Sequence, residues 1–233
     1  MNGMTGKVAL VTGGSVGMEL TRAFLKSGAD VAFVYRNPAR KTAIDKAFVD
    51  FSDVFVSIQA DLADHRQAKK TVDTLKQRFG GVDFLLNSLG GWIGGKKLHE
   101  HSAEEMQKMF SMDFIPTFNI MSAVLPVMAE QKFGRIVNFV SLQIFGSGAG
   151  NSVYAASKSA ILALSKAAAD EYKAANVTVH TIAPSIIDTP SNRKSMHGSE
   201  GKWVKVEEIV DAALFLCGAG EALNDTVLKF PGK

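Results

Sequence analysis

Residues 7–17 read KVALVTGGSVG, a short apolar run rich in β-branched side chains that ends in a glycine-rich turn. The run predicts a buried strand over residues 7–12, and the spacing of apolar residues predicts a helix over residues 18–27. Glycine permits a tight turn and lets backbone N–H groups approach a diphosphate at the N-terminus of a helix. A glycine-rich turn alone is as often an ordinary loop, but its place between strand and helix favours nucleotide binding.

Strand-like and helix-like segments alternate along the rest of the chain. Near-continuous apolar strands between helices predict a parallel sheet that is covered on both faces. Right-handed crossovers then give a single-domain α/β fold over residues 1–233, a Rossmann-like doubly wound sheet of about seven strands. We expect polar loops near a ligand at residues 90–97 and 191–202. The further strands are expected at 30–35, 54–59, 82–87, 135–141, 177–182 and 226–230, and the helices at 39–51, 64–79, 102–131, 152–174 and 206–216.

Composition and charge narrow the class of protein. Apolar residues make up 46% of the chain and charged residues 21%, which is typical of a folded protein. The net charge of +3 comes from scattered Lys and Arg, so nucleic-acid binding is not expected. The single cysteine, Cys217, excludes an internal disulfide and fits a reducing cytoplasm. We see no signal peptide and no apolar run near the length of a membrane span, and the histidines have no metal-ligand spacing.

A tyrosine and a lysine four residues apart, Tyr154 and Lys158, share one face of a predicted helix. An ammonium group close to a phenol lowers its pKa by about 1–3 units from the ordinary value of about 10, which prepares the phenol for proton exchange near neutral pH. Ser141, at the end of the preceding strand, can hold the same substrate oxygen. Such a spacing also occurs by chance on solvated helices, so the rest of the chain decides its meaning.

Several motifs, in order, make the chain resemble the short-chain dehydrogenase/reductase family. The family's Thr-Gly-x-x-x-Gly-x-Gly is matched by Thr12, Gly13 and Gly17, and its Asn-Asn-Ala-Gly by residues 87–90. Its catalytic serine, tyrosine and lysine are matched by Ser141, Tyr154 and Lys158. Its Pro-Gly-x-x-x-Thr is matched by residues 184–189. The resemblance extends from about Gly6 to Gly232.

The resemblance implies an enzyme that interconverts a carbonyl and a secondary alcohol by hydride transfer with NAD(P)(H). It makes Tyr154 the acid or base, with Ser141 positioning the substrate oxygen, Lys158 supporting Tyr154 and Asp113 supporting a proton relay. A 3-ketoacyl reductase and a general alcohol or sugar dehydrogenase both remain open, and a homodimer or homotetramer is implied. The cofactor-binding residues that it implies are Gly13, Ser15, Val16, Gly17, Met18, Arg36, Asp61, Leu62, Asn87, Gly90, Tyr154, Lys158, Pro184, Ile187 and Thr189.

The end of the second strand indicates which dinucleotide binds. An acidic residue there suits the ribose of NAD, whereas arginine suits the 2′-phosphate of NADP. This chain has Tyr35-Arg36-Asn37, followed by Arg40, so NADP(H) is favoured over NAD(H). The alternative is a solvated surface arginine. Asp61 fits an adenine-contacting aspartate, or else a cap for the helix that begins near residue 64.

Four positions depart from the family pattern. Glu19 replaces the third glycine, so it must push the helix outward or turn to solvent, and we expect weaker cofactor binding. Asp113 replaces an asparagine, and the missing N–H of Pro116 predicts a local helix break. Ser185 replaces a glycine and His180 an asparagine. These changes motivate the alternative of a non-catalytic dinucleotide-binding or interaction protein, although the intact proton-handling trio favours the enzyme.

Overall fold

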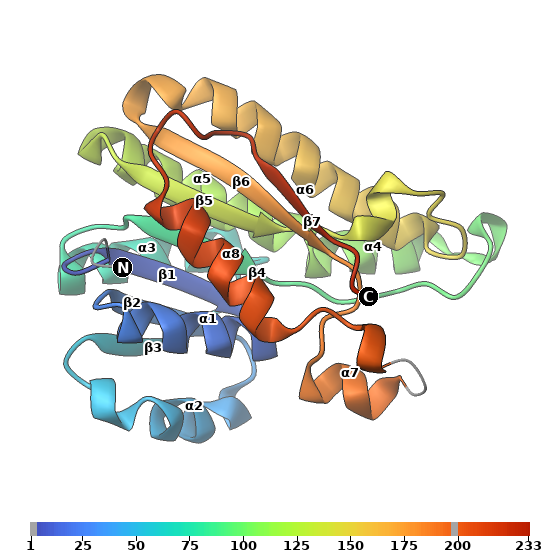
Figure 1. Cartoon of the computed structure of the whole chain (residues 1–233), viewed down its shortest axis with the longest axis horizontal. Coiled ribbons are helices and arrows are strands. Elements are labelled where there is room, and N and C mark those ends of the chain that lie inside the picture. Colours follow the sequence, from blue (N-terminus) through green and yellow to red (C-terminus); the bar gives the residue numbers. More distant parts are fainter. Residues whose placement is uncertain (1–3, 197–199) are drawn as a thin grey trace.

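A seven-stranded parallel sheet forms the centre of the computed structural model, which describes residues 4–196 and 200–233 (Figure 1). The strand order is β3-β2-β1-β4-β5-β6-β7. This confirms the predicted doubly wound sheet. The strands are β1 (Val8–Gly13), β2 (Asp30–Tyr35), β3 (Phe55–Gln59), β4 (Phe84–Ser88), β5 (Gly134–Phe139), β6 (Val177–Pro184) and β7 (Val227–Phe230).

The strand order reverses direction between β1 and β4. From β1 the chain adds β2 and β3 on one side, then returns to place β4 on the other side. Thr12 pairs with Asn87 and Gly13 with Ser88, so the carboxyl ends of β1 and β4 meet side by side. In open α/β sheets this switch point leaves a crevice for a ligand.

Helices cover both faces of the sheet and enclose two cores (Figure 1). Alternate residues of β1 point to opposite faces: Ala9 and Val11 pack with α1, α2 and α8, whereas Val8 and Leu10 pack with α3, α5 and α6. The sheet therefore holds the strand ends rigidly from both sides. The helices are α1 (Ser15–Lys26), α2 (Lys41–Ala47), α3 (His65–Phe79), α4 (Ala103–Met112), α5 (Phe114–Gln131), α6 (Ser152–Glu171), α7 (Pro190–Ser195) and α8 (Val206–Gly218).

Two local expectations were wrong. The helix expected over residues 39–51 is shorter, because only Lys41–Ala47 is α-helical and short 3₁₀ turns flank it. Part of the loop expected at 191–202 is helix α7, while residues 197–199 lie outside the described part. The Thr189 hydroxyl accepts a bond from the Asn192 N–H (3.2 Å), and a proline follows it at the first helical position. This Thr-Pro pair is a recognisable helix start.

The predicted break in the long helix at 102–131 is confirmed. Helix α4 ends at Met112 and α5 begins at Phe114, with Asp113 between them at φ −115° and ψ −64°. By length and composition the whole stretch Ala103–Gln131 could still cross a membrane, contrary to our expectation that no apolar run has that length. Half of its most apolar 18-residue segment is buried within the protein, and a packed core helix can have the same length and apolar composition.

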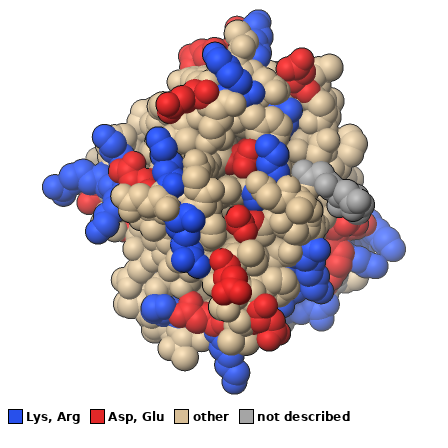
Figure 2. All heavy atoms as spheres, turned by 90° about the vertical axis from the view of Figure 1, so that its left-hand side faces the viewer, with Lys and Arg blue, Asp and Glu red and all other residues tan. Residues whose placement is uncertain are grey.

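Charges of both signs are interspersed on the face that Figure 2 shows. Lysine and arginine side chains alternate there with aspartate and glutamate, in keeping with the scattered charges of the sequence. This face therefore does not concentrate the positive charge that binds a nucleic-acid backbone.

Candidate active site

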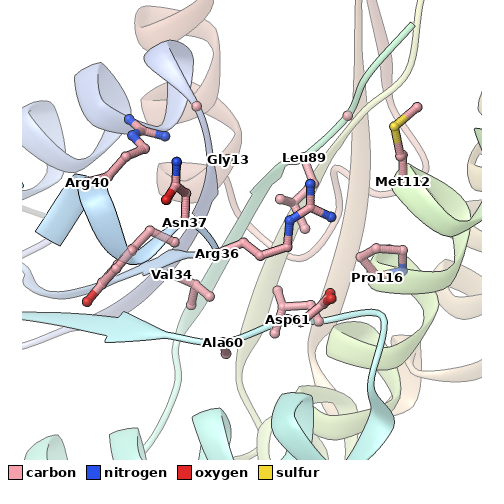
Figure 3. Close-up of a pocket in the computed structure, with 14 residues that line it drawn as sticks. Gly13, Val34, Arg36, Asn37, Arg40, Ala60, Asp61, Leu89, Met112 and Pro116 are labelled. Atoms are coloured by element: carbon pink, nitrogen blue, oxygen red, sulfur yellow. The ribbon is translucent and has the colours of Figure 1, made fainter. Parts of the chain in front are cut away.

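A cleft of about 240 Å³ opens at the carboxyl ends of β1, β2, β3 and β4 (Figure 3). It brings together five of the residues predicted to bind the cofactor, and it adds a wall from α4 and α5 that the sequence did not indicate. The residues that line it are Gly13, Gly14, Val34, Tyr35, Arg36, Asn37, Arg40, Ala60, Asp61, Leu62, Leu89, Gly90, Met112 and Pro116.

The glycine turn after β1 is packed so closely that side chains would not fit at two of its positions. Gly13 has φ +117°, and a Cβ there would lie 2.7 Å from the Ser88 carbonyl oxygen. A Cβ on buried Gly17 would lie 2.8 Å from the Thr12 carbonyl oxygen, so α1 packs tightly against β1. Helix α1 begins at Ser15 without a hydrogen bond from a capping side chain. Its first backbone N–H groups therefore suit an anionic ligand.

Glu19 turns away from this turn toward solvent. Its side chain is 49% exposed, and its Oε2 lies 3.6 Å from Nε of Arg22 one helical turn later. Of the two outcomes expected for Glu19, the structure shows the solvent-facing one. The close helix–sheet packing is supplied by Gly17, so α1 is not displaced at that point.

The side of the cleft near β2 carries two arginines. Figure 3 shows Arg36 extending into the cleft from the end of β2, with Asp61 beside it and Pro116 on the opposite wall. Arg40 follows one turn later and also lines the cleft. Asp61 is not the cap of α3, because that helix is capped by Asp64, whose Oδ1 accepts the Arg66 N–H (2.8 Å).

Asn87 is buried and serves the sheet rather than the cleft. Its Oδ1 accepts a bond from the Thr12 hydroxyl (2.8 Å), and its Nδ2 donates to Asn138 Oδ1 (3.3 Å). Asn138 in turn donates to the Ser165 hydroxyl (2.8 Å). The chain of bonds ties β1, β4 and β5 to α6. The Asn87 side chain therefore links the strands beside the cleft, and its predicted contact with the cofactor stays a prediction.

Ser141, Tyr154 and Lys158, the residues for which a proton-handling role is predicted, lie in one region of the structure. Ser141 follows β5, while Tyr154 and Lys158 lie on one face of α6. The Ser141 hydroxyl is close enough to Tyr154 to favour the ionised phenol, and Nζ of Lys158 lies 6.0 Å from the centre of the Tyr154 ring. Ser141 and Lys158 are buried, and Tyr154 is half-buried.

Lys158 is held mainly by groups other than Tyr154. Its Nζ lies 3.3 Å from Oδ2 of Asp113 and donates to the carbonyl oxygens of Phe139 (3.3 Å) and Leu89 (3.4 Å). Asp113 Oδ1 accepts the Gly91 N–H (2.8 Å). Asp113 and Lys158 therefore form a buried ion pair.

The pKa of Tyr154 is raised, whereas we expected Lys158 to lower it. Burial is the main cause, and the negative charge of Asp113 adds to it, while the Ser141 hydrogen bond acts in the opposite direction. Burial also raises the pKa of Asp113, against the attraction of Lys158, and lowers the pKa of Lys158. The expectation was wrong because burial of the phenol outweighs the effect of a lysine that is itself paired with Asp113.

The segment after β6 also lies at the edge of the sheet that is formed by the carboxyl ends of the strands. Pro184 ends β6, and the Ser185 hydroxyl donates to the Pro231 carbonyl oxygen (2.9 Å). This bond accounts for the serine in place of a glycine, because it ties β6 to the C-terminal segment. The Ile187 carbonyl oxygen accepts a bond from Asn192 Nδ2 (2.8 Å), and Thr189 caps α7.

His180 and Cys217 are buried in the core, as expected for packed residues. His180 Nε2 lies 3.0 Å from the Thr178 hydroxyl, and burial lowers its pKa to about 4. Burial raises the pKa of the Cys217 thiol far above its ordinary value. Within residues 4–196 and 200–233, no three His, Cys, Asp or Glu side chains form a group that could hold a metal ion.

A family model for short chain dehydrogenases matches residues 7–200. The chain belongs to this family. An uncharacterised oxidoreductase of Staphylococcus epidermidis is 28% identical over 90% of each chain. A 3-oxoacyl-[acyl-carrier-protein] reductase of Chlamydia trachomatis is 28% identical over 98% of this chain and 97% of the relative. The structure of ElxO with NADP bound superposes with a TM-score of 0.90 at 24% identity over 96% of each chain, which shows the same fold. This short-chain dehydrogenase is thus an oxidoreductase by family.

Sequence reasoning missed the far wall of the cleft. Met112 and Pro116 line it from the α4–α5 junction, where the helix break turns these side chains toward the strand ends. The helix-breaking Pro116 was the available signal, although it indicated the break and not its position beside the cleft. The Gly91 N–H, which holds Asp113, could not be found from side-chain motifs.

Proposed function

We propose that the chain is an NAD(P)(H)-dependent oxidoreductase that interconverts a carbonyl and a secondary alcohol, with Tyr154 as the acid and base. The observation that carries this proposal is the position of Gly90. It lines the nucleotide cleft, and a Cβ there would lie 2.9 Å from Nζ of Lys158. The cleft and the proton-handling trio are therefore parts of one continuous site.

Each residue of the site has a distinct role in this reaction. The dinucleotide, held by the glycine turn and the cleft, supplies or accepts the hydride. In reduction the Tyr154 hydroxyl gives its proton to the carbonyl oxygen, and in oxidation the phenolate takes the alcohol proton. Ser141 holds the same oxygen, and Lys158 binds the nicotinamide ribose. Thr189 can still donate its hydroxyl hydrogen to a cofactor amide while it caps α7.

NADP(H) is the proposed cofactor. Arg36 and Arg40 line the cleft beside β2, and a guanidinium group matches the oxygens of a 2′-phosphate. No carboxylate stands at residues 35–37, where a ribose hydroxyl would need one. Asp61 and Leu62 line the same cleft and suit the adenine.

The proposed substrate is a small carbonyl compound with an apolar chain, in the manner of a 3-ketoacyl reductase. Relatives at 27% and 28% identity are 3-oxoacyl-[acyl-carrier-protein] reductases of Chlamydia. Trp92, Phe145 and Met196 are large apolar side chains in the loops after β4, β5 and α7, and all three are exposed. A sugar dehydrogenase would instead need polar groups there to bond the hydroxyls of its substrate.

A measurement of turnover distinguishes this function from that of a non-catalytic dinucleotide-binding protein. The Asp113–Lys158 ion pair favours the non-catalytic function, because the aspartate neutralises the lysine. The experiment measures NADPH binding by calorimetry and NADPH oxidation with a panel of 3-ketoacyl thioesters, ketones and keto sugars. Oxidation with one class supports the enzyme. Binding without turnover on every class supports the second function.

A homodimer or homotetramer in the cytoplasm is proposed as well. Phe110, Phe114 and Phe118 form a row of aromatic rings along α4 and α5, with centres 5.8 Å and 6.3 Å apart. Phe118 is 44% exposed at the end of this row. Light scattering after size exclusion checks the assembly, and a Phe118→Glu variant is expected to dissociate it because a charge would enter an apolar contact.

A further inference from the structure

The carboxylate of Asp113 lies beside Lys158, and few other groups around it can bind it. Asp113 is fully buried, and Oδ2 has no hydrogen-bond partner apart from the ammonium group 3.3 Å away. The backbone carbonyl of Asp113 is also engaged, because it accepts bonds from the Thr117 hydroxyl (2.7 Å) and the Thr117 N–H (3.4 Å). The carboxylate therefore faces Lys158 directly.

The pair of Asp113 and Lys158 has no net charge. If the proton resides on the lysine, one positive and one negative group stand side by side, and if it moves to the aspartate, both groups are neutral. The burial of both side chains brings their affinities for this proton closer together. In either arrangement Tyr154 has no unopposed positive charge beside it.

The other groups that face Tyr154 do not replace that charge. The Ser141 hydroxyl, two residues after β5, is neutral and only favours the phenolate without carrying a charge. Lys158 lies on the same helix, and Asp113 faces the site from the α4–α5 junction. The polar groups from the β4 and β5 ends are the Leu89 and Phe139 carbonyl oxygens and the Gly91 N–H, which bond to the pair.

From this geometry we infer that Asp113 is a positioning residue that keeps the Tyr154 hydroxyl protonated throughout the neutral range, so that the site is prepared to donate a proton to a carbonyl. The inference rests on the proposed role of Tyr154 and adds a pH regime to it. Carbonyl reduction uses the protonated phenol, so its rate should be flat near neutral pH. Alcohol oxidation uses the phenolate and should rise only at alkaline pH.

The test is a titration of tyrosinate by ultraviolet absorbance on the full chain without substrate or cofactor. The chain has three tyrosines, so the difference between the wild type and Tyr154→Phe isolates the signal of Tyr154. The expected midpoint for Tyr154 lies above that of a free phenol, because burial and the charge of Asp113 raise its pKa. A midpoint clearly below about 10 would overturn the inference.

The matched variant is Asp113→Asn, measured with and without Tyr154→Phe. Removing the carboxylate leaves the charge of Lys158 unopposed, so the midpoint is expected to fall by about 1 unit or more. A smaller fall, or a rise, contradicts the inference. Asp45→Asn removes another carboxylate paired with a lysine, Lys41, on the distant helix α2, and should leave the midpoint unchanged.

The titration does not require turnover, so its result is independent of whether any substrate in the panel reacts. If Asp113→Asn does not fold, which circular dichroism reports, Asp113→Ser removes the same carboxylate, and the same fall of the midpoint is expected in it. Where a substrate is found, the alkaline limb of alcohol oxidation in Asp113→Asn should shift to lower pH by the same amount as the tyrosinate midpoint.

Discussion

At the residue scale, the site depends on one glycine that touches both of its halves. A Cβ on Gly90 would lie 2.9 Å from Nζ of Lys158 and 3.2 Å from Oδ1 of Asp113. We expect Gly90→Ala to displace the lysine and reduce kcat/KM by on the order of 100-fold, because misplacement by about 1 Å has effects of that size. Steady-state kinetics check this, with Gly220→Ala as the control because a Cβ there meets nothing within 4 Å. Equal losses in both variants would contradict it.

Arg36 is predicted to favour the binding of NADPH over that of NADH. The proposed bonds to a 2′-phosphate are charge-assisted and contribute about 1.5–3 kcal/mol. Arg36→Ala is therefore expected to weaken NADPH binding by about 10-fold or more and leave NADH binding nearly unchanged. Arg66→Ala, an exposed arginine at the start of α3, is the control. Calorimetry measures both affinities, and a parallel loss for both dinucleotides would contradict the assignment.

At the scale of elements, helix α1 presents its N-terminus to the proposed diphosphate and carries Glu19 one turn inside. The carboxylate is solvated and paired with Arg22, so its repulsion of an anion should be small. We expect Glu19→Gln to tighten NADPH binding by about 0.3–1 kcal/mol at low salt and by less at high salt. Calorimetry at two ionic strengths tests this. Unchanged binding at low salt would show that Glu19 does not oppose the cofactor.

At the scale of the whole molecule, buried His180 links folding to pH. Its pKa is lowered from the ordinary value of 6.5 to about 4 in the folded chain, so the unfolded chain binds the proton more readily. The free energy of unfolding should therefore fall as pH drops from 6.5 to about 4, by up to about 3 kcal/mol, and this contribution stays constant below that range. Urea unfolding should show a flatter pH dependence in His180→Asn, and an identical slope in both proteins would contradict the prediction.

The sequence was most informative where the signal was local and periodic. The apolar strands and the glycine turn after β1 predicted the sheet, and the order of motifs predicted the trio of Ser141, Tyr154 and Lys158. The charge state of that trio could not be predicted, because it depends on Asp113 reaching Lys158 from another helix, across a backbone bond to Gly91. The partner of the Asn87 side chain could not be predicted either, because its amide oxygen accepts a bond from the Thr12 hydroxyl on the neighbouring strand.

Tyr154 is proposed to transfer the proton during reduction of a carbonyl. The most direct measurement compares the rate of NADPH oxidation with a reactive carbonyl in the wild type, in Tyr154→Phe and in Tyr172→Phe, which loses a hydroxyl at the end of α6. We expect a loss of about 10²–10⁴-fold in Tyr154→Phe, with NADPH binding retained, and little change in Tyr172→Phe. A Tyr154→Phe variant that reduces the carbonyl at the wild-type rate would contradict it.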